Sequence, residues 1–80
     1  MVRVLAFAGA RDVLGSPELH LSIDGPCTAA QLLERVCAQF PRLEPYRRSI
    51  RVAVNGSYAQ WDDQVQTGDE VALIPPVAGG

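Results

Sequence analysis

The chain has 80 residues, 48% of them apolar, and a formal net charge of −2 at pH 7. A chain of this length forms one small domain, and its apolar share argues against intrinsic disorder. The acidic balance and the lack of a basic run argue against nucleic-acid binding, and no apolar stretch is long enough to predict a membrane span.

Cysteine and lysine usage narrows the possible chemistry. The two cysteines, Cys27 and Cys37, are too few for a disulfide scaffold or a four-ligand zinc site. The first residues lack a signal-peptide cleavage site, so we expect a protein of the reducing cytoplasm. All seven basic residues are arginines. The chain therefore offers no lysine side chain that could accept an isopeptide bond.

The first quarter of the chain predicts two paired strands. Residues 2–7 are rich in Val, Leu and Phe and predict a strand that is apolar on both faces, with Leu5 and Phe7 on the face opposite to the core. A helical turn is expected over 9–14. Residues 18–24 then alternate strictly between apolar and polar side chains, which indicates a half-buried strand in a hairpin with the first.

One helix is predicted next. Thr28 and Gln31 have the spacing of a capping box, in which each side chain satisfies a backbone N–H at the start of the helix. The apolar residues that follow lie on one helical stripe: Leu32, Leu33, Val36, Cys37 and Phe40. Pro41 ends the helix. The segment 42–49 has no clear periodicity, and we expect a loop there.

The second half predicts three strands. Residues 50–54 alternate, and Asn55-Gly56 is a strong signal for a two-residue hairpin turn because both residues accept positive φ. Residues 57–60 form the short return strand, and 61–67 form a polar connection. Residues 70–74 predict the last strand.

These elements predict an α+β fold of the β-grasp, or ubiquitin-like, type over residues 1–74. A mixed sheet of about five strands has one main helix on one face, because a single helix must cover the sheet to bury both. The first and last strands then lie side by side and parallel. Residues 75–80 form an extended tail.

The tail is the candidate functional segment. It consists of Pro75, Pro76, Val77, Ala78, Gly79 and Gly80. The prolines favour an extended backbone and end strand pairing, so the tail reaches about 20 Å from the body. Two glycines without side chains can enter a narrow channel of another protein. Activation of the Gly80 carboxylate as an acyl-adenylate would allow a sulfur donor to form a thiocarboxylate there. The alternative is an ordinary frayed terminus.

A second candidate feature is a patch on the sheet face that the helix leaves open. The alternation of the strands places Leu5, Phe7 and Ile74 on that face, and Tyr58 on the short return strand can extend the group. Apolar patches of this kind mark protein interfaces. The alternative is that some of these side chains pack inside the body.

Several other reactive or charged residues are expected to be structural. We predict that Cys37 is part of the core, Cys27 is a bystander, His20 is solvated and Trp61 anchors a loop. Four carboxylates are expected to form a solvated acidic edge: Asp62, Asp63, Asp69 and Glu70.

Three segments together, 2–8, 53–56 and 68–80, resemble the small, sulfur-carrying subunits of molybdopterin synthase. The contiguous block that ends Pro75-Pro76-Val77-Ala78-Gly79-Gly80 is the specific part. The resemblance implies that Gly80 carries sulfur as a thiocarboxylate and delivers it to cyclic pyranopterin monophosphate. It implies no bound cofactor, since the ATP is used by the activating partner.

The resemblance also implies the partners. These are a large subunit that supplies the catalytic groups in a heterotetramer, a ubiquitin-activating-type adenylating enzyme and a sulfurtransferase. Carriers for thiamine, cysteine or tRNA thiolation share the fold and the Gly-Gly end, and remain alternatives. So do a ubiquitin-like protein modifier, which would join the same carboxylate to a target lysine, and a plain binding module.

Overall fold

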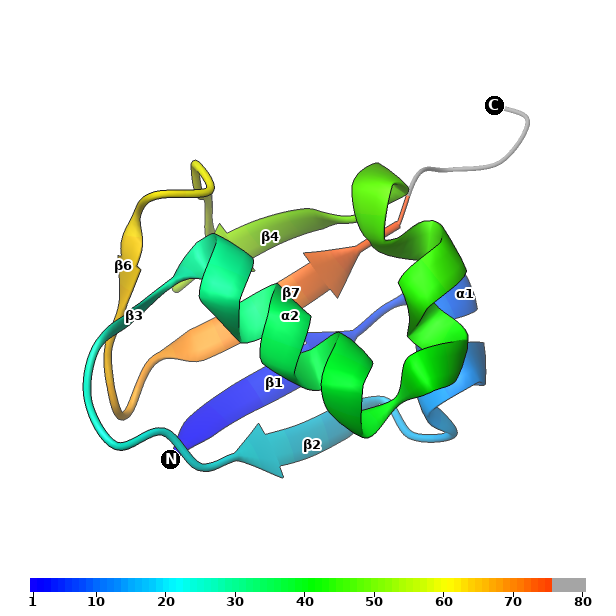
Figure 1. Cartoon of the computed structure of the whole chain (residues 1–80), viewed down its shortest axis with the longest axis horizontal. Coiled ribbons are helices and arrows are strands. Elements are labelled where there is room, and N and C mark those ends of the chain that lie inside the picture. The colour runs from blue at the N-terminus through cyan, green and yellow to red at the C-terminus, as the bar shows by residue number, and fades with distance from the viewer. Residues whose placement is uncertain (76–80) are drawn as a thin grey trace.

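The computed structural model describes residues 1–75, and the side chain of Ala8 is not among the described groups. One helix, α2, lies across one face of a five-stranded sheet, with α1 and η1 at one end of the molecule and β3 and β6 at the other (Figure 1). The elements in chain order are β1 (Val2–Ala6), α1 (Ala8–Leu14), β2 (Glu18–Leu21), β3 (Cys27–Thr28), α2 (Ala29–Gln39), η1 (Pro41–Ser49), β4 (Arg51–Val54), β5 (Ser57–Tyr58), β6 (Gln64–Val65) and β7 (Glu70–Ile74).

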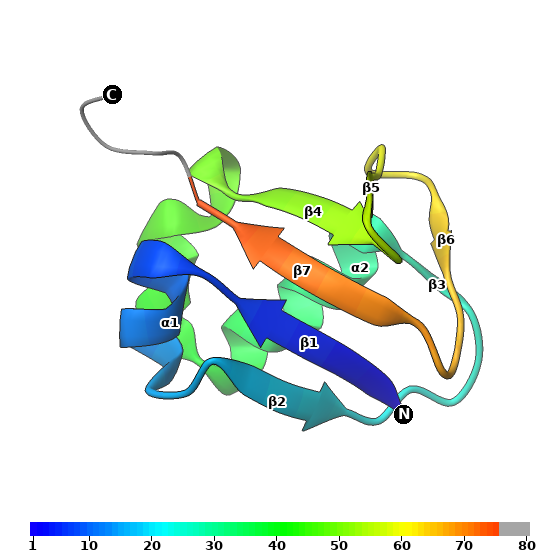
Figure 2. The same ribbon diagram turned by 180° about the vertical axis from the view of Figure 1, so that it is seen from behind.

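The main sheet has the predicted mixed topology, with strand order β2-β1-β7-β4-β5. The first and last strands, β1 and β7, are parallel neighbours, and the other pairs are antiparallel. Figure 2 shows β7 in the middle of the sheet, between β1 and β4. The strand that leads into the tail is therefore paired on both sides. The strand order and the parallel β1–β7 pair confirm the β-grasp prediction.

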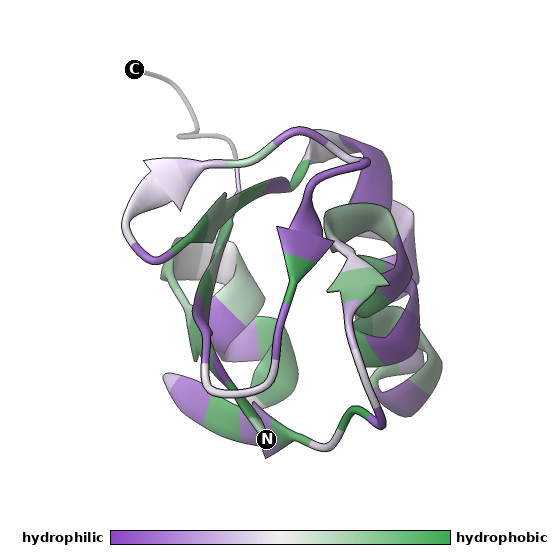
Figure 3. Cartoon of the chain, turned by 90° about the vertical axis from the view of Figure 1, so that its left-hand side faces the viewer, coloured by the Kyte–Doolittle hydropathy of each residue, from purple (hydrophilic) through white to green (hydrophobic). Residues whose placement is uncertain are grey.

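Helix α2 begins and packs as its sequence predicts. The Thr28 hydroxyl accepts a hydrogen bond from the Gln31 N–H at 3.1 Å, and the Gln31 side-chain oxygen accepts one from the Thr28 N–H at 2.9 Å. The inward face of the helix is buried: Ala29, Leu32, Leu33, Val36 and Cys37. Figure 3 shows this apolar side turned toward the sheet and the polar side turned outward. Burial of this stripe against the sheet removes apolar surface from water and so stabilises the fold.

The predicted loop over 42–49 is wrong, because these residues form the 3₁₀ helix η1. Pro41 lies in the first turn of η1, where its fixed φ suits a helical backbone and no N–H is needed. Leu43 anchors the element in the core with no exposed surface. Its side chain closes the end of the core beyond α2, so η1 is part of the body.

The predicted polar connection 61–67 contains a strand, β6, that the sequence pattern did not predict. Cys27 of β3 pairs with Val65 of β6, and the two form a separate two-stranded sheet. The chain leaves β2 after Leu21, earlier than the predicted end at residue 24, and then reaches β3. Two-residue strands carry no readable periodicity, which explains the omission.

The hairpin turn is confirmed, and the return strand is shorter than predicted. Asn55 and Gly56 have φ of 51° and 87°, as a two-residue hairpin requires. β5 ends at Tyr58, although the Ala59 N–H still donates to the Val52 carbonyl at 2.9 Å. The Gln60 N–H instead donates to the Asp63 carboxylate at 2.8 Å, so a turn replaces the predicted end of the strand.

Within residues 1–75, none of the helices is long and apolar enough to cross a membrane.

Candidate functional site

The root of the tail is held by the centre of the sheet. β7 ends at Ile74, whose register partner across β4 is Arg51, and Pro75 follows as a half-buried residue. Because β7 is bonded on both sides, its end is a fixed point from which the chain leaves the sheet. The predicted tail residues beyond it lie outside the described part of the chain: Pro76, Val77, Ala78, Gly79 and Gly80. Their roles stay predictions.

The face of the sheet opposite α2, here called the outer face, is apolar around the end of β7. Leu5 is the register partner of Ala72, Ala72 of Ala53, and Ala53 of Tyr58. Paired residues share a face, so these four side chains form one row across four strands. The two alanines form a low floor between larger side chains. The result is a shallow hollow of about 330 Å³.

All four predicted interface residues border this hollow. Phe7 and Tyr58 are 49% and 69% exposed, whereas Leu5 and Ile74 are half-buried at its rim. The prediction that they share the outer face is therefore confirmed, and the alternative of burial inside the body is wrong. Their role as an interface stays a prediction. The floor of small residues was not predicted from the sequence, although the alternation of β4 and β7 could have indicated it.

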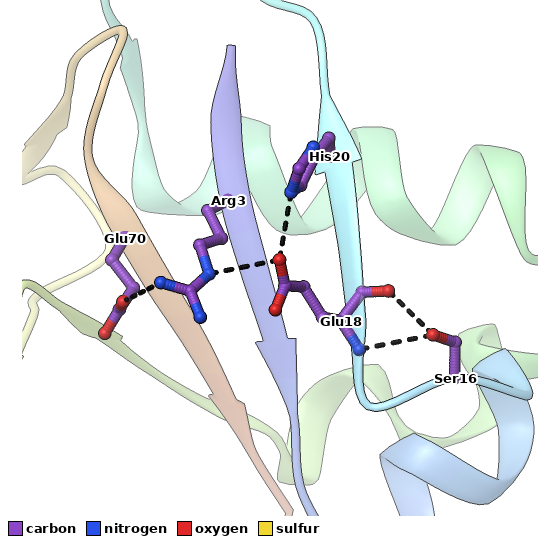
Figure 4. A network of polar contacts seen from close by, with 5 residues as sticks. All are labelled: Arg3, Ser16, Glu18, His20 and Glu70. Carbon is purple, nitrogen blue, oxygen red and sulfur yellow. Dashed lines mark hydrogen bonds and ion pairs between the residues drawn. The ribbon is translucent and has the colours of Figure 1, made fainter.

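The opposite end of the outer face is charged. Arg3 donates to Glu18 and to Glu70, both at 3.1 Å, and so connects three strands (Figure 4). His20 lies 3.0 Å from the Glu18 carboxylate and is exposed, as predicted. The hydrogen bonds from His20 and Arg3 hold the pKa of Glu18 below its ordinary value. The hydrogen bond to Glu18, together with the charge of that carboxylate, raises the pKa of Arg3 in return.

Because of this network, the two ends of the outer face differ in chemical character. A partner that covers it meets mainly apolar groups, with the exposed Arg51 beside them, at the root of the tail, and an ion-pair network at the start of β1. The apolar end suits a desolvated contact, whereas exposed ion pairs contribute little affinity and mainly orient a partner.

The cysteines and the acidic edge are structural. Cys27 and Cys37 are free and buried, and burial raises the pKa of the Cys37 thiol, so it is a poor nucleophile. Asp63 and Asp69 accept hydrogen bonds from the N–H groups of Gln60 and Gln66, both at 2.8 Å, and so close turns. Among residues 1–75, no three metal-ligating side chains come together.

Comparisons with known proteins agree with this fold. The model of the ThiS family matches residues 4–80. The molybdopterin synthase sulfur carrier subunit of Arabidopsis thaliana is 38% identical over 79 residues, which cover 99% of this chain and 82% of that protein. The corresponding subunit of Escherichia coli is 35% identical, with both chains covered completely. The crystal structure of small archaeal modifier protein 1 from Haloferax volcanii superposes with a TM-score of 0.84 at 30% identity, covering 99% of this chain and 98% of that one.

Proposed function

This chain belongs to the ThiS family, beside the molybdopterin synthase sulfur carrier subunits, and from that membership we propose that it carries sulfur for molybdenum cofactor synthesis. The observation that carries the proposal is the position of Ile74-Pro75. The strand that leads into the Gly-Gly end is the central one of the sheet, and it ends beside the apolar hollow of the outer face. A partner that covers the hollow thereby lies beside Ile74, from which the chain continues into the tail.

The chemistry resides in the carboxylate of Gly80. Attack of this carboxylate on the α-phosphate of ATP, in an adenylating partner, releases pyrophosphate and leaves an acyl-adenylate. A sulfur nucleophile at the sulfide level, released from a sulfurtransferase by a thiol reductant, then attacks the acyl carbon, displaces AMP and leaves a thiocarboxylate. The net change on this chain is one oxygen replaced by one sulfur. The sulfur is finally delivered to cyclic pyranopterin monophosphate.

The main partner is the large subunit of molybdopterin synthase. The relatives are named as subunits of that enzyme, and the outer face offers an apolar surface for such a contact. The catalytic groups for dithiolene formation belong to the large subunit, since a carrier needs only the tail and a docking face. A heterotetramer of two large and two small subunits in the cytoplasm fits this division of labour.

Intact mass spectrometry tests the proposal. We expect the protein purified from its own host, or treated with adenylating enzyme, sulfurtransferase and ATP, to exchange one oxygen for one sulfur at Gly80. A matched variant with one alanine appended after Gly80 keeps the whole body and should stay unmodified. A wild-type chain that remains unmodified under all these conditions contradicts the proposal. Adding the large subunit and the pterin then tests for dithiolene product.

A protein modifier is the second candidate, because the chain is 30% identical to a protein named as a small archaeal modifier. The same acyl-adenylate would then react with a target lysine, and the product would be an isopeptide between Gly80 and another protein. Peptide mapping of the same host extract distinguishes the two. Carriers for thiamine, cysteine or tRNA thiolation would load sulfur at Gly80 but would yield no dithiolene with the large subunit.

A further inference from the structure

The arginines of this acidic protein are unevenly distributed. Four of the seven lie within residues 42–51: Arg42, Arg47, Arg48 and Arg51. Only Glu44 opposes them in that segment. The fold places the segment over η1 and the start of β4, at the same end of the sheet as the root of the tail.

Ion pairing divides these arginines into two groups. Arg47 lies 3.4 Å from the carboxylate of Glu44 and 3.7 Å from that of Glu34, so its charge is compensated. The other three take part in none of the ion pairs formed within residues 1–75, and two of these three, Arg48 and Arg51, lie together. Both border one hollow of about 470 Å³ at the edge of the sheet. Their charges are thus available there to an external anion.

Two exposed aromatic side chains border the same hollow. Tyr58 lies on one side, and Trp61, which is 46% exposed, lies on the other. Trp61 also borders a second hollow of about 300 Å³, together with Arg47 and Arg48. Arginine, tyrosine and tryptophan are the residues most enriched at the energetic centres of protein interfaces. We call the group Arg48, Arg51, Tyr58 and Trp61 the Arg-Trp surface.

The hollow lies where the sheet edge is open. β5 pairs with β4 only through Ala53 and Val54, and one further hydrogen bond reaches Val52. At Arg51, the edge of β4 that faces away from β7 is paired with none of the strands in the described part of the chain. An extended segment of a partner can lie along such an edge, with its side chains in the flanking hollow.

Charge decides what kind of segment fits. Two uncompensated arginines suit one or two carboxylates, because a guanidinium binds a carboxylate through two parallel hydrogen bonds. A long polyanion fits poorly, since Asp62 and Asp63 follow Trp61 directly and the whole chain carries a charge of −2. We propose that the Arg-Trp surface binds a short, extended acidic segment of a partner protein. This binding goes beyond sulfur carriage and requires no modification of Gly80.

Trp61 is the only tryptophan of the chain, so its fluorescence reports on this surface directly. The probe is a synthetic oligoglutamate peptide titrated into the full-length protein, with oligoserine and oligolysine peptides of equal length as controls. We expect oligoglutamate alone to change the Trp61 emission, and added salt to weaken the effect. If the Trp61 emission does not change at peptide concentrations up to about 1 mM, a Kd typical of weak binding, the proposal is contradicted.

Paired variants locate the site. R48Q/R51Q should lower the affinity for oligoglutamate roughly tenfold, as expected from loss of two exposed charge contacts. R11Q/R35Q removes the same charge from other exposed positions and should bind as the wild type does. Equal loss in both variants means general charge attraction and overturns the proposal. So does a single-stranded oligonucleotide that binds as tightly as the peptide. The chain lacking Gly80 should bind oligoglutamate normally, so failure of sulfur loading leaves this result unchanged.

Discussion

Asn55 and Glu70 are joined by two hydrogen bonds between the hairpin turn and the start of the strand that leads into the tail. The Asn55 N–H donates to the Glu70 carbonyl at 2.7 Å, and the Glu70 N–H donates to the Asn55 side-chain oxygen at 3.0 Å. The Asn55 amide also donates to Asp69 at 3.2 Å. One residue therefore supplies the positive φ of the turn and fixes the register of β7.

Replacing Asn55 separates these two roles. Asn55→Ala removes the side-chain bonds and strains the backbone at positive φ, and should lower the free energy of unfolding by about 2 kcal/mol. Asn55→Gly removes the same bonds but tolerates the φ, so we expect about half that loss. Urea unfolding measures both. An alanine variant as stable as the glycine variant would show that the turn conformation is unimportant.

The outer face can be tested with two exposed tyrosines. Tyr58→Ser removes a side chain from the hollow of the outer face, whereas Tyr46→Ser removes one from η1, where it borders a separate hollow that also contacts Pro75. Both variants should stay within about 1 kcal/mol of wild-type stability. Only Tyr58→Ser should weaken binding to the large subunit in calorimetry. Equal affinities of the two variants would argue against the outer face as the interface.

Leu43 tests whether η1 belongs to the core. Leu43→Ala creates a cavity at a fully buried position and should lower the free energy of unfolding by about 2–5 kcal/mol. Leu19→Ala removes the same atoms from a partly buried position on β2 and should cost less. If urea unfolding finds Leu43→Ala the milder change, η1 is a surface appendage.

The ion pairs of Glu18 predict a small pH dependence of stability. Since the folded-state pKa of Glu18 lies below its ordinary value of 4.5, its stabilising contribution is complete above that pH. It is lost as the pH falls through the folded-state pKa. Glu18→Gln should therefore flatten the acid limb of the stability profile, more at low salt than at high salt, because the network is exposed.

Denaturant unfolding across this acid range provides the check on Glu18. Asp24→Asn is the matched control, because Asp24 is exposed and takes part in none of the ion pairs found within residues 1–75. The acid limbs of the two variants should differ more at low salt than at high salt. Identical profiles for Glu18→Gln and Asp24→Asn would remove Glu18 as a source of acid sensitivity.

The sequence alone determined the features that depend on neighbours in the chain. The capping box of Thr28 and Gln31 and the Asn55-Gly56 turn need only local spacing, and the predicted strands follow from alternation. The order of the elements also predicted the parallel pairing of the first and last strands, because a single helix must cover one face of a sheet that contains both. The Gly-Gly end could also be recognised from the sequence, because it is one contiguous block of neighbouring residues.

Only the tertiary structure decided the rest. Two-residue strands such as Cys27–Thr28 have too few residues to show a period, and Leu43 lies in a proline-rich segment without one. The Arg3 network forms only when three strands pair in the correct register. The hollow beside Ile74 forms only when four strands do so. Arg51 and Trp61 share a surface because β5 ends early, at a turn closed by Asp63. Such sites arise from contacts between residues far apart in the sequence, which local patterns do not encode.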